Sequence, residues 1–158
     1  MNLTIEIDDS LSPLLEGVRE SFESGDLRVR IQAAMAHTFA TVVNHNFGGE
    51  GEDRPHDWRI LSERYALAYK DGDRTPTLIL DGNLKASIEI DDQSIDAASV
   101  YTNNPYAVAQ QFGDATTNLP ARPFFPMTED GQVTEYTAEK CVQAARSELS
   151  RFFNETLG

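Results

Sequence analysis

The histidines and the acidic pairs are the side chains that could bind a metal, and none of them has the spacing of a metal site. His37 and His45 lie eight positions apart on a predicted helix, about 80° apart around its axis. Two metal ligands on one helix usually lie four positions apart, so these histidines are too distant to share an ion. The pairs Asp8-Asp9 and Asp91-Asp92 lack the ordered oxygen ligands and the bidentate glutamate of a calcium loop. We therefore expect no metal and no other cofactor.

The other reactive groups also lack the partners that their chemistry requires. Cys141 has no motif around it, which favours a structural thiol over a nucleophile. The run GGEGED at residues 48–53 has no lysine and no strand–helix context for binding a phosphate. We therefore expect a protein without catalytic residues. Because paired carboxylates cannot be recognised from spacing alone, a small hydrolase stays an alternative, and a pocket in which carboxylates or His37 converge would support it.

The composition predicts one acidic domain, residues 1–158, without a membrane span. A chain of 158 residues can bury a core without disulfides. The 26 acidic and 13 basic residues give a formal net charge of −13, which disfavours binding to nucleic acid and to anionic membranes. A single cysteine cannot form an internal disulfide, which suits a reducing cytoplasm. No apolar run reaches the roughly 18 residues of a membrane span, and residues 1–9 lack the apolar run of a signal peptide.

Hydrophobic periodicity predicts an α+β fold. Residues 3–8 and 86–91 alternate apolar and polar side chains, and residues 95–101 are predicted to return as the next strand of a small, mostly antiparallel sheet. Residues 27–47 carry apolar side chains at spacings of three and four, so we expect a long amphipathic helix that packs against this sheet or, as the alternative, faces a neighbouring subunit. Thr137 can cap a C-terminal helix that packs on the same core.

Three shorter elements connect these parts. A helix is predicted from residue 58 to about residue 70, with Trp58 on its apolar side. Asp81-Gly82 can turn the chain and cap a helical turn ahead of residues 86–91. Residues 106–112 are predicted to form a short helix that Gly113 closes, since glycine tolerates the left-handed conformation at a helix end.

Two segments, residues 47–56 and 114–135, are expected to be flexible or to become ordered on a partner. The second contains LPARPFFP at residues 119–126, whose prolines exclude it from a central strand and whose phenylalanines require burial. Arg122 can form a salt bridge within the chain or anchor a contact between subunits. The candidate assembly contacts are Gly49, Glu50 and Gly51 in the first segment and Arg122, Pro123, Phe124 and Phe125 in the second.

Four short stretches share a pattern with one known family. They are DWRILS at residues 57–62, LDGNLKASI at 80–88, YAVAQQFG at 106–113 and PARPFF at 120–125. In this order they resemble the phage virion morphogenesis, or tail completion, family, typified by the G protein of phage Mu and the S protein of phage P2. The one departure is Asp81, which stands where the family usually has threonine and can make the same cap. The motif residues are Trp58, Asp81, Gly82, Leu84, Ser87, Tyr106, Phe112 and Gly113.

This resemblance implies a structural protein without catalysis, acting in tail completion and head–tail joining as an oligomeric ring at the neck. The implied partners are other copies of the chain and other phage head and tail proteins, such as neck, terminator or tail tube proteins, with no sequence-specific nucleic acid and no membrane. The implied location is the host cytoplasm during assembly and then the head–tail junction of the virion. The alternative is another phage structural component, such as a tail terminator or a minor capsid-associated protein.

Overall fold

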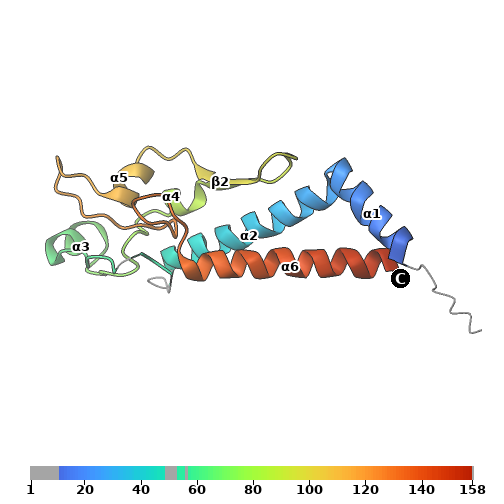
Figure 1. Ribbon diagram of the computed structural model, residues 1–158. Coiled ribbons are helices and arrows are strands. Elements are labelled where there is room, and N and C mark those ends of the chain that lie inside the picture. The colour runs from blue at the N-terminus through green and yellow to red at the C-terminus, as the bar shows by residue number, and fades with distance from the viewer. Residues whose placement is uncertain (1–10, 49–52, 56, 158) are drawn as a thin grey trace, which may run out of the picture.

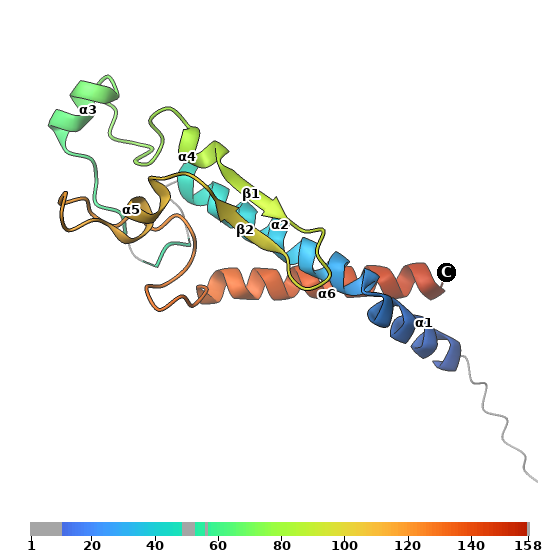
Figure 2. The same cartoon turned by 90° about the horizontal axis from the view of Figure 1, so that it is seen from above.

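Two long helices that lie side by side form the body of the protein. The computed structural model describes residues 11–48, 53–55 and 57–157. In it α2 (Asp26–Gly48) packs along α6 (Glu135–Leu157), and α1 (Leu11–Ser24) leads into α2 at one end (Figure 1). A hairpin of β1 (Ile88–Asp91) and β2 (Ser99–Thr102) lies along another side of α2, as Figure 2 shows from above. The predicted α+β class, with a long helix and a C-terminal helix packed together, is confirmed.

A glycine makes the sharp corner between α1 and α2 possible. Gly25 has a φ of 87°, a left-handed conformation that residues with side chains rarely adopt. A Cβ atom at this position would lie 2.0 Å from Cδ1 of Ile95, so the corner packs closely against the loop of the hairpin. The loop and the corner therefore fix each other's position.

Helix α2 has apolar side chains around much of its circumference because the hairpin covers one side of it and α6 covers another. Leu27, Val43 and Phe47 are all buried between the hairpin, α6 and the loops at one end. An ion pair also crosses to α6, where Nε of Arg30 donates to Oε1 of the buried Glu148 at 2.6 Å. Since most of the helix surface faces other elements, apolar side chains occur around much more than one narrow stripe.

The two strands pair in an antiparallel register that places apolar side chains on one face. Ile88 lies opposite Thr102, and Ile90 lies opposite Val100. These four side chains are half-buried, while the residues between them are exposed. The hairpin therefore turns its apolar face towards α2, as alternation along a strand predicts.

Both strands are shorter than predicted, because polar side chains bind the backbone at their ends. The first begins after α4 (Asn83–Ala86), and the hydroxyl of Ser87 bonds to the carbonyl of Leu84 at 2.8 Å. The second begins only at Ser99, after a loop in which the N–H of Asp96 donates to the hydroxyl of Ser94 at 3.2 Å. The predicted strand at residues 3–8 lies outside the described residues.

The prediction that a helix begins at residue 58 is wrong for its first turn. Helix α3 (Glu63–Tyr69) begins five residues later, and the hydroxyl of Ser62 caps it by accepting from the N–H of Tyr65 at 3.3 Å. Trp58 and Leu61 lie before it in an irregular segment, where both are buried. Tertiary bonds hold this segment in place of helical ones, including a bond of 2.8 Å from Nε of Arg74 to the carbonyl of Leu61.

Helix α6 begins three residues earlier than a cap at Thr137 would place it, and Thr137 is not its cap. The first helical bond joins the N–H of Ala138 to the carbonyl of Thr134 at 2.9 Å. Thr137 is fully buried, and its hydroxyl donates to the carboxylate of Asp53, as does that of Thr134 at 2.6 Å. A buried carboxylate from another segment therefore fixes the start of this helix. The short helix predicted at residues 106–112 is present as α5 (Ala107–Phe112).

The burial of Leu27 generates a stability prediction. Leu27 is 1% exposed, so Leu27→Asp places an unpaired charge in the interior and should lower the free energy of unfolding by at least about 3 kcal/mol. Leu15→Asp is the matched control, because Leu15 is 62% exposed and should change this free energy by less than about 0.5 kcal/mol. Urea denaturation followed by circular dichroism measures both. Equal unfolding midpoints for the two variants would contradict the packing of α2.

Candidate functional site

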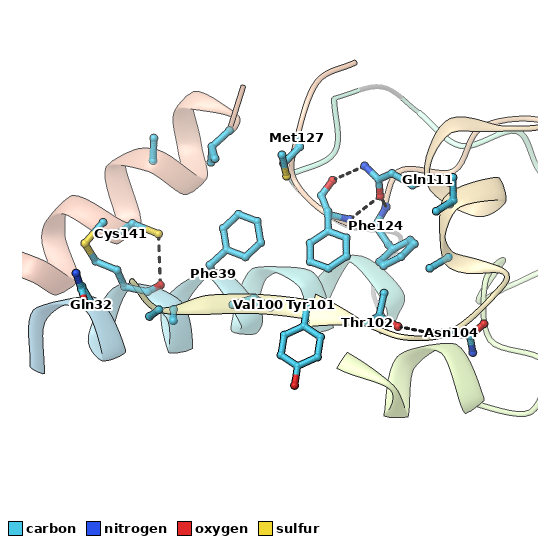
Figure 3. Close-up of a pocket in the computed structure, with 18 of the residues that line it drawn as sticks. Gln32, Phe39, Val100, Tyr101, Thr102, Asn104, Gln111, Phe124, Met127 and Cys141 are labelled. Atoms are coloured by element: carbon cyan, nitrogen blue, oxygen red, sulfur yellow. Dashed lines mark hydrogen bonds between the residues drawn. The ribbon is translucent and has the colours of Figure 1, made fainter. Parts of the chain in front are cut away.

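The described part of the chain carries an open groove of about 740 Å³. Its walls come from α2, β2, α5, α6 and the segment at residues 124–127, as the close-up in Figure 3 shows. Phe39 of α2 and Val100 of β2 line one side, while Cys141 of α6 and Met127 line the other. Three separate regions of the sequence, residues 32–39, 98–112 and 124–142, therefore meet around this groove.

The lining of the groove is apolar, and the described residues that form it include no Asp, Glu, His, Lys or Arg. Its polar groups are hydroxyls and amides, such as those of Thr102, Asn104 and Gln111. Burial raises the pKa of the Cys141 thiol, whose sulfur lies 3.6 Å from the carbonyl oxygen of Met35, so the thiol stays protonated and is a poor nucleophile. The chemistry of this lining suits an apolar ligand or polypeptide segment.

Several large apolar side chains at the groove remain open to solvent. Val108 of α5 is 70% exposed, Phe112 is 57% exposed, and Val142 of α6 is 46% exposed. Val133 is also exposed and also lines the groove. Exposed apolar surface of this kind is typical of protein contact sites, and here it occurs on a chain whose net charge is strongly negative.

One side chain, that of Gln111, holds the proline-rich segment (residues 119–126) against α5. Its Oε1 atom accepts from the N–H groups of Phe124 and Phe125, each at 3.0 Å, and its Nε2 donates to the carbonyl of Phe125 at 3.1 Å (Figure 3). The N–H of Arg122 adds a backbone bond of 2.6 Å to the carbonyl of Gln110. A single buried amide therefore fixes the two phenylalanines that form one end of the groove.

A second set of bonds fixes the same segment from the side of α2. Nδ2 of Asn46 donates to the carbonyls of Asp53 and Phe124 at 3.1 and 3.0 Å, and Nε1 of Trp58 donates to the carbonyl of Pro123 at 3.1 Å. The rings of Phe47 and Phe124 lie with their centroids 5.0 Å apart. Phe124 is completely buried, so it belongs to the core as well as to the groove.

Arg122 lies buried in this region without a carboxylate partner among the described residues. Its Nε and Nη2 atoms donate to the carbonyl of Arg59 at 3.4 and 3.3 Å. Desolvation is the main cause that lowers the pKa of this guanidinium, opposed by Tyr65 and reinforced by the charge of Arg59. The guanidinium still keeps its proton, because arginine does not deprotonate in proteins. The salt bridge within the chain that the sequence suggested is not formed by the described carboxylates.

The candidate assembly contacts fall into three places. Arg122, Pro123 and Phe124 are buried inside the chain, whereas Phe125 is half-buried at the groove. Residues 49–51, which contain Gly49, Glu50 and Gly51, lie outside the described residues. The structure describes residues 114–135 throughout, with isolated bridges that pair Asp114 with Leu119 and Met127 with Val133. Contact of these residues with a partner stays a prediction.

The motif at residues 80–88 forms the turn that leads into the hairpin. The carboxylate of Asp81 accepts from the N–H of Asn83 at 3.0 Å, and Gly82 takes a φ of 81°. Aspartate therefore forms the turn in place of the family's threonine. The hydroxyl of Ser87 then meets that of Thr102 at 2.7 Å, which ties this motif to the end of β2. Leu84 packs against the core cluster.

The motif at residues 106–113 supplies α5 and its end. Tyr106 precedes α5 and is exposed, and Phe112 is exposed and lines the groove. Gly113 follows with a φ of 76°, and a Cβ atom there would lie 2.8 Å from the backbone nitrogen of Ala121. Glycine is thus required both by the backbone conformation and by the close approach of the proline-rich segment.

Sequence reasoning missed Gln111, Asn46 and Asp53, three buried polar residues that organise the region. The available signal was a polar residue next to apolar ones in a predicted helix, as in the Gln110-Gln111 pair. That signal does not tell which of the two glutamines faces inward, because the short helix α5 has little periodicity to orient it.

The groups considered for metal binding are dispersed. Over residues 11–48, 53–55 and 57–157, no three His, Cys, Asp or Glu side chains gather as metal ligands would. His37 is exposed and pairs through Nε2 with Asp92 at 2.9 Å, outside the groove. Within the same described ranges, no helix is long and apolar enough to cross a bilayer.

Comparisons with known proteins add no relative. The sequence matches no family model, no curated protein and no solved structure. The resemblance to the tail completion family therefore rests on the four motifs alone.

The role of Gln111 is testable with a neighbouring control. Gln111→Leu removes three hydrogen bonds and leaves buried backbone groups of the phenylalanines without partners, so it should lower the free energy of unfolding by about 2–4 kcal/mol. Gln110→Leu should change it by less than about 1 kcal/mol, because Oε1 of Gln110 is buried without a hydrogen bond. Denaturant unfolding of the two variants provides the comparison. If Gln110→Leu is the more damaging of the two, the assignment of Gln111 is wrong.

Proposed function

We propose that this chain is a non-enzymatic structural protein of a phage that acts in tail completion and head–tail joining as part of an oligomeric ring at the neck. The observation that carries the proposal is the physical link between two of the motifs that resemble the family. Gln111, from YAVAQQFG, binds the backbone of Phe124 and Phe125, from PARPFF. Residues that recur together in a family pattern are expected to meet in space when they perform one structural task.

The other two motifs pack in the same region as YAVAQQFG and PARPFF. Trp58, from DWRILS, donates to the carbonyl of Pro123 in PARPFF. Leu84, from LDGNLKASI, packs on the core cluster that includes Trp58 and Phe124. All four motifs thus contribute to one packed region beside the groove, which supports treating them as one ordered pattern rather than four chance matches.

The groove and the charge of the chain support a role in assembly. An uncharged apolar groove with exposed valines and a phenylalanine has the character of a protein contact surface. Within the part of the chain that the structure describes, no pair of carboxylates and no histidine lines it, so these residues offer none of the groups that general acid–base chemistry most often uses. The formal charge of −13 suits a protein that flanks a channel through which DNA moves without binding.

Electron microscopy of particles assembled without this protein tests the proposal. We expect negative-stain images to show DNA-filled heads and finished tails that are not joined, and addition of the wild-type chain to restore whole virions. Tails of uncontrolled length would instead favour a tail terminator. Empty immature heads would favour a capsid-associated role, and normal infectious particles would contradict any role in assembly.

A further inference from the structure

We propose that the groove binds residues 3–7 of a second copy of this chain, which add as a strand to the free edge of β2. The proposal concerns contact between copies of the chain and does not depend on where the assembly acts. Four observations lead to it: an unpaired strand edge, an uncharged groove beside that edge, a segment with the matching alternation, and a limit on how far that segment reaches within its own chain.

The edge of β2 that faces away from β1 borders the groove. In the described part of the chain the sheet has two strands, so β2 pairs with β1 on one side only. Figure 2 shows β2 between β1 and α6, and Figure 3 shows β2 running along the groove. Ala98, Val100 and Thr102 line the groove, whereas no residue of β1 does. Unpaired backbone groups along such an edge can accept an extended segment of another chain.

The alternation in residues 3–8 matches the two sides of this edge. Leu3, Ile5 and Ile7 alternate with Thr4, Glu6 and Asp8. In a strand added beside β2, one set of side chains points into the groove and the other set points to the outer face of the hairpin. The apolar set thus meets a lining without charge, and the polar set meets the exposed face of the sheet.

Charge also favours binding of residues 3–7 beside β2 over their binding elsewhere on the surface of the second copy. Each copy carries a formal charge of −13, so two copies repel each other over most of their surfaces. At the outer face the exposed residues of β2 are Ser99 and Tyr101, neither of which is acidic, and the carboxylates of this face, Glu89 and Asp91, belong to β1 on the far side of β2. Glu6 of an added strand would therefore not lie directly opposite a carboxylate of β2, an arrangement that destabilises cross-strand pairs.

Ile7 cannot reach the groove of its own chain, so residues 3–7 cannot occupy it together. A Cβ atom at Gly17 of α1 would lie 3.5 Å from Cγ2 of Thr156, so α1 packs at the C-terminal end of α6 (Figure 1). Thr156 lies about 21 Å along this helix from Val142, which lines the groove, at 1.5 Å per residue. The chain between Ile7 and Leu11 spans at most about 14 Å even when fully extended. The occupant must therefore come from another copy.

A contact of this type joins two different surfaces, the segment of one copy and the groove of the next. Such head-to-tail contacts produce closed rings when the rotation between copies closes, and open chains when it does not. Helix α1, which carries the segment, leaves Leu15 and Phe22 exposed in the single chain. This incomplete coverage of α1 is consistent with its extending towards a neighbouring copy.

A peptide-binding experiment tests the occupant. The receptor is the full chain with Ile5→Asp, whose own segment no longer competes, and the probe is a fluorescein-labelled peptide of residues 1–10. We expect saturable binding by fluorescence anisotropy, weakened at least about tenfold when the peptide carries Ile5→Asp and less than about twofold when it carries Thr4→Asp. These two peptides place the same charge on opposite faces of the strand. No binding at about 1 mM peptide, or equal loss from both changes, overturns the proposal.

Variants of the receptor test the location. Val142→Asp in the groove should weaken peptide binding at least about tenfold, whereas Leu67→Asp on α3 should leave it within about twofold. Both side chains are exposed in the single chain, so neither change should prevent folding, and circular dichroism checks this. Binding that Val142→Asp leaves unchanged would mean that the segment binds elsewhere, and the proposal would fail.

Mixing two full-length variants tests the head-to-tail geometry. Ile5→Asp keeps the groove and loses the segment, whereas Val142→Asp keeps the segment and loses the groove. We expect each variant alone to sediment as a monomer and a mixture of the two at high concentration to form dimers, because one intact segment can meet one intact groove. A mixture that remains monomeric at concentrations where the wild-type chain associates overturns the proposal. This result is independent of the electron microscopy of virions, so the two proposals can fail separately.

Discussion

The amide of Gln111 is the contact on which the groove depends. Residues 119–126 contain prolines and form no strand, so their backbone groups cannot be satisfied by a regular ladder. Gln111 supplies both an acceptor and a donor to Phe124 and Phe125, and does so from inside the protein, where an unpaired backbone group is costly. Without this contact, Phe124 and Phe125 would lose the three bonds that tie them to α5 at one end of the groove.

Other buried polar side chains perform the same task for neighbouring segments. Asn46 bridges two carbonyls, Trp58 binds a third, and the carboxylate of Asp53 receives the hydroxyls at the start of α6. The sheet is small, and much of the chain between α2 and α6 is irregular. Side-chain hydrogen bonds therefore replace the backbone ladders that order a larger sheet, and they leave the groove rigid enough to present a defined surface.

The groove combines two physical requirements of a contact between acidic proteins. Copies of a chain with a formal charge of −13 repel each other, so a contact surface is favoured where charge is absent. The lining satisfies this condition, and its apolar side chains supply the surface whose burial drives association. The unpaired edge of β2 adds direction, because backbone pairing fixes the orientation of an added segment in a way that apolar contact alone does not.

The sequence by itself determined the elements with strong periodicity or distinctive turn residues. The long helix at α2, the C-terminal helix, the hairpin and the glycines at positions 82 and 113 follow from local pattern, because spacing and backbone freedom act over a few residues. Only the tertiary structure decided that Trp58 leaves its predicted helix, that Thr137 binds Asp53, and that Gln111 faces the proline-rich segment. These outcomes depend on bonds between segments far apart in the chain, whose free energy exceeds the small local preference for helix or cap. Only the tertiary structure reveals the groove as well. The residues that line it come from separate parts of the sequence, so no local pattern predicts it.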